Sequence, residues 1–184
     1  GLIQSAVIAM ANPGENILMP RNVHISVIKI CAMQNINPIF FDLEFSTVTG
    51  HYKPITKIWL ENVFKKLNFD ENKIAGVILV NPSYHGYAGD LEPLIDCCHQ
   101  KNLPVLVDEA HGSYFLFCEN LNLPKPALSS NADLVVNSLH KSLNGLTQTA
   151  VLWYKGNLIN EGNLIKSINL LQTTSPSSLL LSSC

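Results

Sequence analysis

Three polar side chains gather directly after one short apolar segment of this sequence. Asp133–Asn137 ends a loop and begins a run with two adjacent valines, which is typical of a buried strand in a parallel sheet. Ser138, His140 and Lys141 follow it within four residues. Ligands of open α/β sheets bind outside the carboxyl ends of the strands, so a hydroxyl, an imidazole and an amine placed there could hold one. A His-Lys pair in a loop is more often a solvated surface feature, so the other strand ends have to carry the argument.

Polar residues follow several of the other predicted strands as well. His24 comes after the first strand, Ser83 lies just beyond the apolar run 74–80, and Asp108 to His111 follow the strand at 105–107. An amine, a carboxylate, an imidazole ring and hydroxyls are the groups that hold an aldehyde cofactor with a ring nitrogen and a phosphate. Asp108 is equally suited to cap the turn that follows it, so from this residue alone both interpretations stay open.

The order of apolar segments predicts one α/β domain with three layers, α/β/α, and a mostly parallel sheet. A chain of 184 residues with 47% hydrophobic content is long enough for one such core. The link between the last two strands is too short for a helical crossover, so this pair is predicted to be antiparallel. Residues 42–52 are predicted to be a loop, and Asn22 is predicted to cap a helix from Val23. The predicted strands are 17–19, 37–41, 74–80, 105–107, 133–137 and 148–154; the predicted helices are 2–11, 23–33, 54–67, 91–101 and 156–171.

Composition argues against several classes of partner. Charged residues are 14% of the chain and the net charge is -2, which leaves no basic stripe for a nucleic acid. No apolar run reaches the roughly 20 residues of a membrane span. The five cysteines show no CxxC spacing and are predicted to be reduced thiols of a cytoplasmic protein. The six histidines lack HxxxH spacing, so no metal site is predicted, and His51 and His99 are expected at the surface.

Five segments, in this order, resemble the major domain of the Orn/Lys/Arg decarboxylase family. They are RNVHISV, NPSYHGYAGDL, VLVDEAHGSYF, ADLVVNSLHKSLNGLTQTAVLW and TTSPSSLLLSS, and together they extend over nearly the whole chain. The resemblance implies the PLP-dependent transferase-like fold, also called the aspartate aminotransferase fold or PLP fold type I. It also implies pyridoxal 5'-phosphate (PLP) as cofactor and a polyamine-related carboxy-lyase that converts arginine, lysine or ornithine to the amine and CO₂. Among the three amino acids we mildly favour arginine.

The resemblance also implies residues that surround the cofactor ring. In the family pattern His24 matches the histidine that stacks on the ring, and Asp108 matches the partner of the pyridine nitrogen. Ala110 would contact the opposite ring face, with His111 beside it. Ser83 lies where the family places a residue near the phenolic oxygen of the cofactor.

The phosphate and aldehyde contacts are implied by the Ser-x-His-Lys segment. Ser138 and His140 match the phosphate contacts, and Lys141 matches the lysine that forms a Schiff base with the cofactor. The turn at 174–176 resembles a segment that reaches the site of a neighbouring subunit, so a homo-oligomer of two or more subunits is expected. The partners expected are therefore a small basic amino acid and further copies of this chain.

Two parts of the family pattern are not found in this sequence. The Gly/Ser/Thr phosphate loop would precede Gly1, and the C-terminal domain would follow Cys184, so residues 1–184 are predicted to be a PLP-binding major domain truncated at both ends. Whether the chain is active by itself stays open. An aminotransferase and an inactive fragment are the alternatives. Asp108–His111 also spells the DEAH box of helicase-type NTPases, but the GxxxxGK[ST] loop that this interpretation needs is absent from the sequence.

Overall fold

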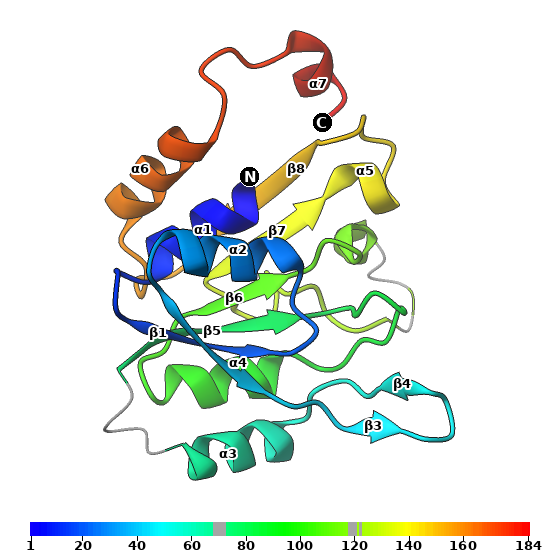
Figure 1. The fold of residues 1–184 in the computed structure, drawn as a ribbon. Coiled ribbons are helices and arrows are strands. Elements are labelled where there is room, and N and C mark those ends of the chain that lie inside the picture. The colour runs from blue at the N-terminus through cyan, green and yellow to red at the C-terminus, as the bar shows by residue number, and fades with distance from the viewer. Residues whose placement is uncertain (68–72, 118–120, 122) are drawn as a thin grey trace.

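A computed structural model describes residues 1–67, 73–117, 121 and 123–184 of the chain. Its centre is a six-stranded sheet with helices on both faces, so the predicted three-layer α/β/α domain is confirmed (Figure 1). The strands are β1 (Asn16–Pro20), β2 (Asn37–Phe41), β5 (Ile74–Val80), β6 (Val105–Asp108), β7 (Leu134–Ser138) and β8 (Ala150–Tyr154). Their order is β2-β1-β5-β6-β7-β8, and all pairs are parallel except β7–β8, which is antiparallel as predicted.

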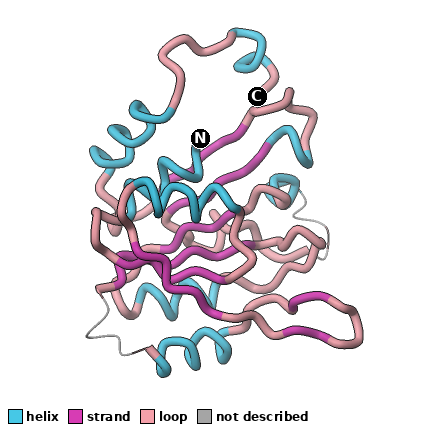
Figure 2. The backbone as a smooth tube through the Cα atoms, in the orientation of Figure 1, coloured by secondary structure: helices cyan, strands magenta, loops and turns pink. Residues whose placement is uncertain are grey.

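The helices divide between the two faces of this sheet (Figure 2). The first group is α1 (Leu2–Met10), α2 (Ile25–Met33) and α6 (Glu161–Leu171), and the second is α3 (Lys57–Lys66) and α4 (Glu92–His99). The first group covers a hydrophobic core with residues such as Val7, Ile30 and Leu164, and the second covers a core with residues such as Leu60 and Ile95. Both faces of the central strands are therefore buried, which is why their sequences are continuously apolar.

Three shorter helical segments complete the described structure. They are a 3₁₀ turn at Ser113–Phe117, α5 (Leu139–Ser142), which begins directly where β7 ends, and α7 (Ser178–Ser182) near the C-terminus. No helix among the described residues is long and apolar enough to cross a membrane.

Two sequence predictions near the start of the chain are wrong. Residues 42–52 are not only loop: β3 (Phe45–Ser46) and β4 (His51–Tyr52) form a small hairpin that projects from the domain (Figure 1). The rings of Phe45 and Tyr52 meet edge to face at 5.4 Å across it, a contact too local and short to leave a periodic pattern. The cap of α2 is His24, not Asn22, because the ring of His24 accepts the N–H of Ser26.

The predictions for histidine and cysteine side chains had mixed outcomes. His99 is half-buried rather than a surface residue, since its Nε2 lies 2.8 Å from Oδ2 of the buried Asp133. Cys31, Cys97, Cys98 and Cys184 are free thiols, and Cys118 lies outside the described residues. Within the described part of the chain, no three His, Cys, Asp or Glu side chains lie together as a metal site would require.

Candidate active site

The pairing of the central strands places the predicted site residues at one edge of the sheet. In the parallel register Val80 lies opposite Asp108, and Asp108 lies opposite Val136, two residues before Ser138. The polar segments after β5, β6 and β7 therefore emerge side by side, as the carboxyl ends of parallel strands must. The α5 turn then directs Lys141 back over the end of β6.

Lys141 and His111 form a close pair although they are thirty positions apart in the sequence. Nζ of Lys141 lies 3.2 Å from Nε2 of His111. A lysine ammonium can only donate, so Nε2 of His111 is the acceptor and this ring is neutral when the lysine is charged. Burial lowers the pKa of His111, and the charge of Lys141 lowers it further, while Asp108 acts in the opposite direction. The pair can thus pass a proton between an amine and an imidazole.

Asp108 is a buried carboxylate at the end of β6. The backbone N–H of Ala110 donates to its Oδ1 at 3.2 Å, which turns the carboxylate toward the site. Burial raises the pKa of Asp108; the Ala110 N–H and the charges of Lys141, His24 and His111 act in the opposite direction. A positively charged ring nitrogen placed against this carboxylate would stabilise its ionised form.

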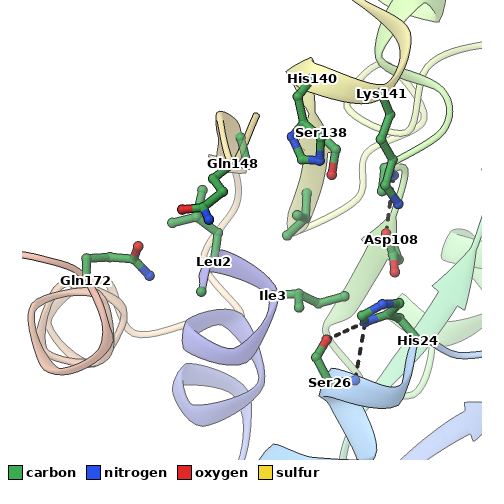
Figure 3. A pocket seen from close by; sticks show the side chains of 14 residues that line it. Leu2, Ile3, His24, Ser26, Asp108, Ser138, His140, Lys141, Gln148 and Gln172 are labelled. Atoms are coloured by element: carbon green, nitrogen blue, oxygen red, sulfur yellow. Dashed lines mark hydrogen bonds between the residues drawn. The ribbon is translucent and has the colours of Figure 1, made fainter. Parts of the chain in front are cut away.

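His24 lies at the N-terminus of α2 with its ring held in one orientation. Nδ1 accepts the N–H of Ser26 at 3.2 Å and lies 2.7 Å from the hydroxyl of the same residue. The other ring nitrogen, Nε2, therefore carries the hydrogen when the ring is neutral. Figure 3 shows the ring next to Asp108, at the wall of the cavity, where a flat ligand could stack on it.

Ser138 and His140 lie at the end of β7 and in α5, next to Lys141 at the same cavity (Figure 3). Nδ1 of His140 lies 2.9 Å from the carbonyl oxygen of Thr149, and since a carbonyl only accepts, Nδ1 is the donor. Nε2 can then donate to an anionic oxygen only when the ring is protonated. Ser138 occupies the position before α5, and its hydroxyl makes no capping bond within the helix. Both groups can serve an anion at this point.

These residues surround a cavity of about 520 Å³ (Figure 3). The volume is within the range of small-molecule and cofactor sites. All the residues predicted to contact the ring or the phosphate, apart from Ser83 and His111, line it. Sequence reasoning did not find the other lining residues: Gly1, Leu2, Ile3, Ser26, Val136, Gln148, Ala150 and Gln172.

A second, smaller cavity of about 90 Å³ lies on the other side of Lys141. Lys141, Asp108, Ala110 and His24 line both cavities, so these four residues form the partition between them. His111 faces only the smaller one. The smaller cavity is otherwise lined by Asn22, Val80, Pro82 and Tyr84, to which sequence reasoning had assigned no contact with a ligand.

Ser83 is the predicted site residue that the described cavities do not include. Its Oγ accepts the N–H of Tyr87 at 3.2 Å, while its neighbours Pro82 and Tyr84 line the smaller cavity. The role of Ser83 near the phenolic oxygen stays a prediction. The exposed segment at 174–176, between α6 and α7, likewise stays a predicted subunit contact.

Comparison with known proteins decides the family. Residues 2–184 match the model of the "Orn/Lys/Arg decarboxylase, major domain". The chain belongs to this family. Curated relatives of this family member include an arginine decarboxylase of Bacillus cereus, 37% identical over 183 residues, and one of Bacillus subtilis, 35% identical over 183 residues. Both alignments span the whole chain but only 38% and 36% of the relatives, so the chain corresponds to little more than a third of their length.

Solved structures of low sequence identity share the fold of this family member. The constitutive lysine decarboxylase of Escherichia coli superposes with a TM-score of 0.79 at 18% identity, over 98% of this chain and 26% of that one. A PLP-bound putative aminotransferase of Clostridium difficile gives 0.72 at 16% identity, over 100% of this chain and 47% of that one. The predicted PLP fold type I is therefore confirmed. With the family established, Asp108–His111 is a decarboxylase segment, and the helicase-type interpretation of its spelling is wrong.

Proposed function

We propose that this chain is the cofactor-binding part of a PLP-dependent decarboxylase that converts a basic amino acid, arginine in the first place, to its amine and CO₂. The observation that supports this most is the meeting of Lys141, Asp108 and His24 around one cavity with Ser138 and His140. An attachable amine, a carboxylate, a stacking ring and anion donors are together what PLP requires.

The residues present fit the cofactor. Ser138 and His140 would hold the phosphate, and His140 would do so as a charged donor because its other nitrogen is bonded to Thr149. Asp108 would hold the pyridine nitrogen, with the ring between His24 and Ala110, and Lys141 would bind the aldehyde. When bound, PLP supplies a sink for the electron pair that remains as CO₂ leaves the substrate.

The proton that replaces CO₂ must come from a group beside the reacting carbon. Lys141 lines the cavity, and its Nζ, when free of the cofactor, would be able to carry that proton. His111, at 3.2 Å, can return a proton to the amine or accept one from it. Asp108 would be kept ionised by a positively charged ring nitrogen beside it, because an opposite charge at short range favours the ionised carboxylate.

The names of the curated relatives favour decarboxylation over transamination. At 35–37% identity they are arginine decarboxylases, whereas the aminotransferases resemble this chain only in fold. We further propose that residues 1–184 are a major domain, and that a cytoplasmic homo-oligomer is the working form, with the exposed turn at 174–176 at the subunit contact. Segments outside these residues would then select among arginine, lysine and ornithine.

The experiment that tests this function is trapping of the cofactor. The purified protein is mixed with PLP, its visible absorbance is recorded, and the sample is reduced with borohydride and mapped by peptide mass. We expect a visible band that reduction abolishes, with the added mass on the peptide that contains Lys141. Lys155→Ala, which removes a surface amine, should label fully, and Lys141→Ala should not label.

The reaction itself is followed with amino acids that carry ¹⁴C in the carboxyl group. Release of labelled CO₂ from arginine, and less from lysine or ornithine, is the expected result. Transfer of the amino group to a 2-oxo acid without CO₂ release would instead establish the aminotransferase alternative. Label on a lysine other than Lys141 would contradict the proposed site.

A further inference from the structure

Glu109 is a fully buried carboxylate that the proposed chemistry does not use. Its side chain is inaccessible to solvent, with an exposed fraction of 0%. Oε1 accepts the backbone N–H of Ala127 at 2.8 Å, and Oε2 accepts Nδ2 of Asn137 at 3.1 Å. The same Nδ2 also donates to the backbone oxygen of Glu109 at 3.1 Å. A buried charge with such specific partners calls for an explanation.

The direction of every bond in this group is fixed. The indole N–H of Trp153, which can only donate, lies 2.8 Å from Oδ1 of Asn137. The amide nitrogen of Asn137 must therefore face Glu109, and the backbone N–H of Ala127 is also only a donor. Both oxygens of Glu109 consequently face donors, so three elements, the 127 loop, β7 and β8, are tied to one carboxylate.

This group lies directly behind the candidate active site. Successive residues of a strand point to opposite faces of the sheet, so Asp108 and Ser138 line the cavity while Glu109 and Asn137 lie on the reverse side. The N–H of Glu109 also donates to the oxygen of Val136 at 3.0 Å. The peptide that follows Glu109 carries the Ala110 N–H, which orients Asp108.

We propose that Glu109 and Asn137 are a positioning pair that sets the distance between the two halves of the cofactor site. One half is the ring contact at the end of β6, and the other is the phosphate and lysine segment at the end of β7. Glu109 directly follows Asp108, and Asn137 directly precedes Ser138. A change in the bonds between Glu109 and Asn137 therefore moves Asp108 relative to Ser138. This inference rests on the proposed function, because it concerns the same site.

Exchanging the two side chains tests the pair. In Glu109→Gln one end of the new amide presents N–H to a donor, whichever way it is turned, and in Asn137→Asp two carboxylates face each other. Each single variant should weaken PLP binding by roughly ten-fold, the loss of about one hydrogen bond to the cofactor once Asp108 and Ser138 are displaced relative to each other. The double variant Glu109→Gln/Asn137→Asp lets the new amide donate to the new carboxylate, and should recover part of the loss, since the bond to the backbone oxygen of residue 109 is not restored.

Asp133→Asn is the matched control. Asp133 is a buried carboxylate that joins the same two strands at their other end, where its Oδ2 accepts the N–H of Val105 at 2.8 Å. This variant should lower the melting temperature about as much as Glu109→Gln while leaving the PLP dissociation constant unchanged. The pair would be structural only, and the proposal overturned, if Glu109→Gln behaved in the same way or if the double variant recovered nothing.

A readout without cofactor shows whether the bonds themselves respond. The indole N–H resonance of Trp153 should shift in Glu109→Gln and return in the double variant. That of Trp59, which donates to the carbonyl of Asp42 at 2.8 Å, should not move. A wild-type protein that binds no PLP would overturn both the proposed function and this proposal. A wild-type protein that binds PLP, with variants that bind it equally well, would overturn this proposal alone.

Discussion

The two ends of the β6–β7 strand pair differ in how their buried polar groups are hydrogen-bonded. At the amino end Asp133 is bonded through its backbone and one carboxylate oxygen: its backbone bonds to Val105 and Lys155, and its Oδ2 accepts from Val105 and contacts His99. These hydrogen bonds are all made between groups of the protein itself.

At the carboxyl end two buried polar atoms have no partner within the described part of the protein. In the described part of the chain, the buried side-chain atoms without a hydrogen-bond partner are Oδ1 of Asn22 and Oγ of Ser142, and both lie at this end. Burial raises the pKa of Asp108, which means that its charge also lacks full compensation. Asn22 lines the smaller cavity and Ser142 lines neither site cavity, so the two ends differ in how fully their buried polar groups are paired within the described structure.

The largest predicted difference is in turnover, between alanine substitutions of one lysine at each end of the strand pair. Lys141→Ala removes the amine that would bind the cofactor, and we expect turnover to fall by roughly a thousand-fold or more, the order found when a covalent catalytic group is lost. Lys155→Ala removes an amine that only donates to Asn131 near the amino end, and should leave turnover unchanged. The measurement is the rate of CO₂ release from arginine. Equal rates for Lys141→Ala and wild type would remove the chemical distinction between the ends.

The free energy of unfolding should depend on pH because of a buried carboxyl group at the carboxyl end of the strand pair. Burial raises the pKa of Glu109 from 4.5 to about 7, against the N–H of Ala127 and the amide of Asn137. A carboxyl group whose pKa is higher in the folded than in the unfolded protein contributes its full stabilisation of the fold when the pH is below its unfolded pKa. This contribution is lost as the pH rises through its folded pKa. We therefore expect the free energy of unfolding of the cofactor-free protein to fall by about 3 kcal/mol between pH 4.5 and 8 from this residue.

Denaturant titrations across this pH range check the expectation. Asp108 shifts in the same direction, so part of the slope should persist in Glu109→Gln. The substitution should nevertheless flatten the profile. An unchanged slope in Glu109→Gln would mean that the carboxylate is already compensated in the fold.

Substitution of one aspartate at each end of the strand pair should affect kcat at the carboxyl end and the melting temperature at the amino end. Asp108→Asn removes the charge opposite the cofactor nitrogen, and kcat should fall about a hundred-fold, which corresponds to a shift of two pKa units at that nitrogen. The melting temperature without cofactor should not fall, because the substitution removes an undercompensated buried charge. Asp133→Asn should do the reverse, with a lower melting temperature and an unchanged kcat for the folded enzyme. Parallel losses in both variants would show that the two ends do not differ.

The sequence was sufficient for the features that depend on local pattern. Continuously apolar runs such as 74–80 predicted the central strands, because only buried strands tolerate such a run at this length. The short link before β8 predicted its antiparallel direction. The apolar pattern placed Lys141, Asp108 and His24 after strand ends, the family resemblance implied their roles, and the parallel register brings them together in one cavity.

What the sequence did not reveal depends on contacts between distant segments. Gln172 lines the cavity because α6 packs on α1, where Ser167 Oγ donates to the oxygen of Ser5 across 162 positions. Gln148 faces the same cavity with a φ of 77°, a conformation that glutamine seldom adopts and that no pattern predicts. Tyr84 reaches the smaller cavity only because its loop folds against His111, with ring centres 5.5 Å apart.

The smallest effects we predict are the losses of stability when one glycine at each end of the strand pair is replaced by alanine. A Cβ on Gly112 would lie 2.6 Å from Pro82 and 2.8 Å from the Glu109 side chain, so Gly112→Ala should force these groups apart and cost about 2 kcal/mol of stability. Gly156, beside Asp133, has a φ of +87°, and a Cβ there would make a tight contact at 3.2 Å with Oδ1 of Asp133, so Gly156→Ala should cost about 1 kcal/mol, mainly from backbone strain.

The two glycine variants differ further in what they disturb. Gly112→Ala pushes on Glu109, and through it on the segment that orients Asp108, so PLP should bind more weakly as well. Gly156→Ala acts only at the amino end and should leave the PLP dissociation constant unchanged. Unfolding curves and a cofactor titration on both proteins make the measurement. If Gly112→Ala bound PLP as tightly as Gly156→Ala at equal loss of stability, the packing behind the site would have no influence on the cofactor.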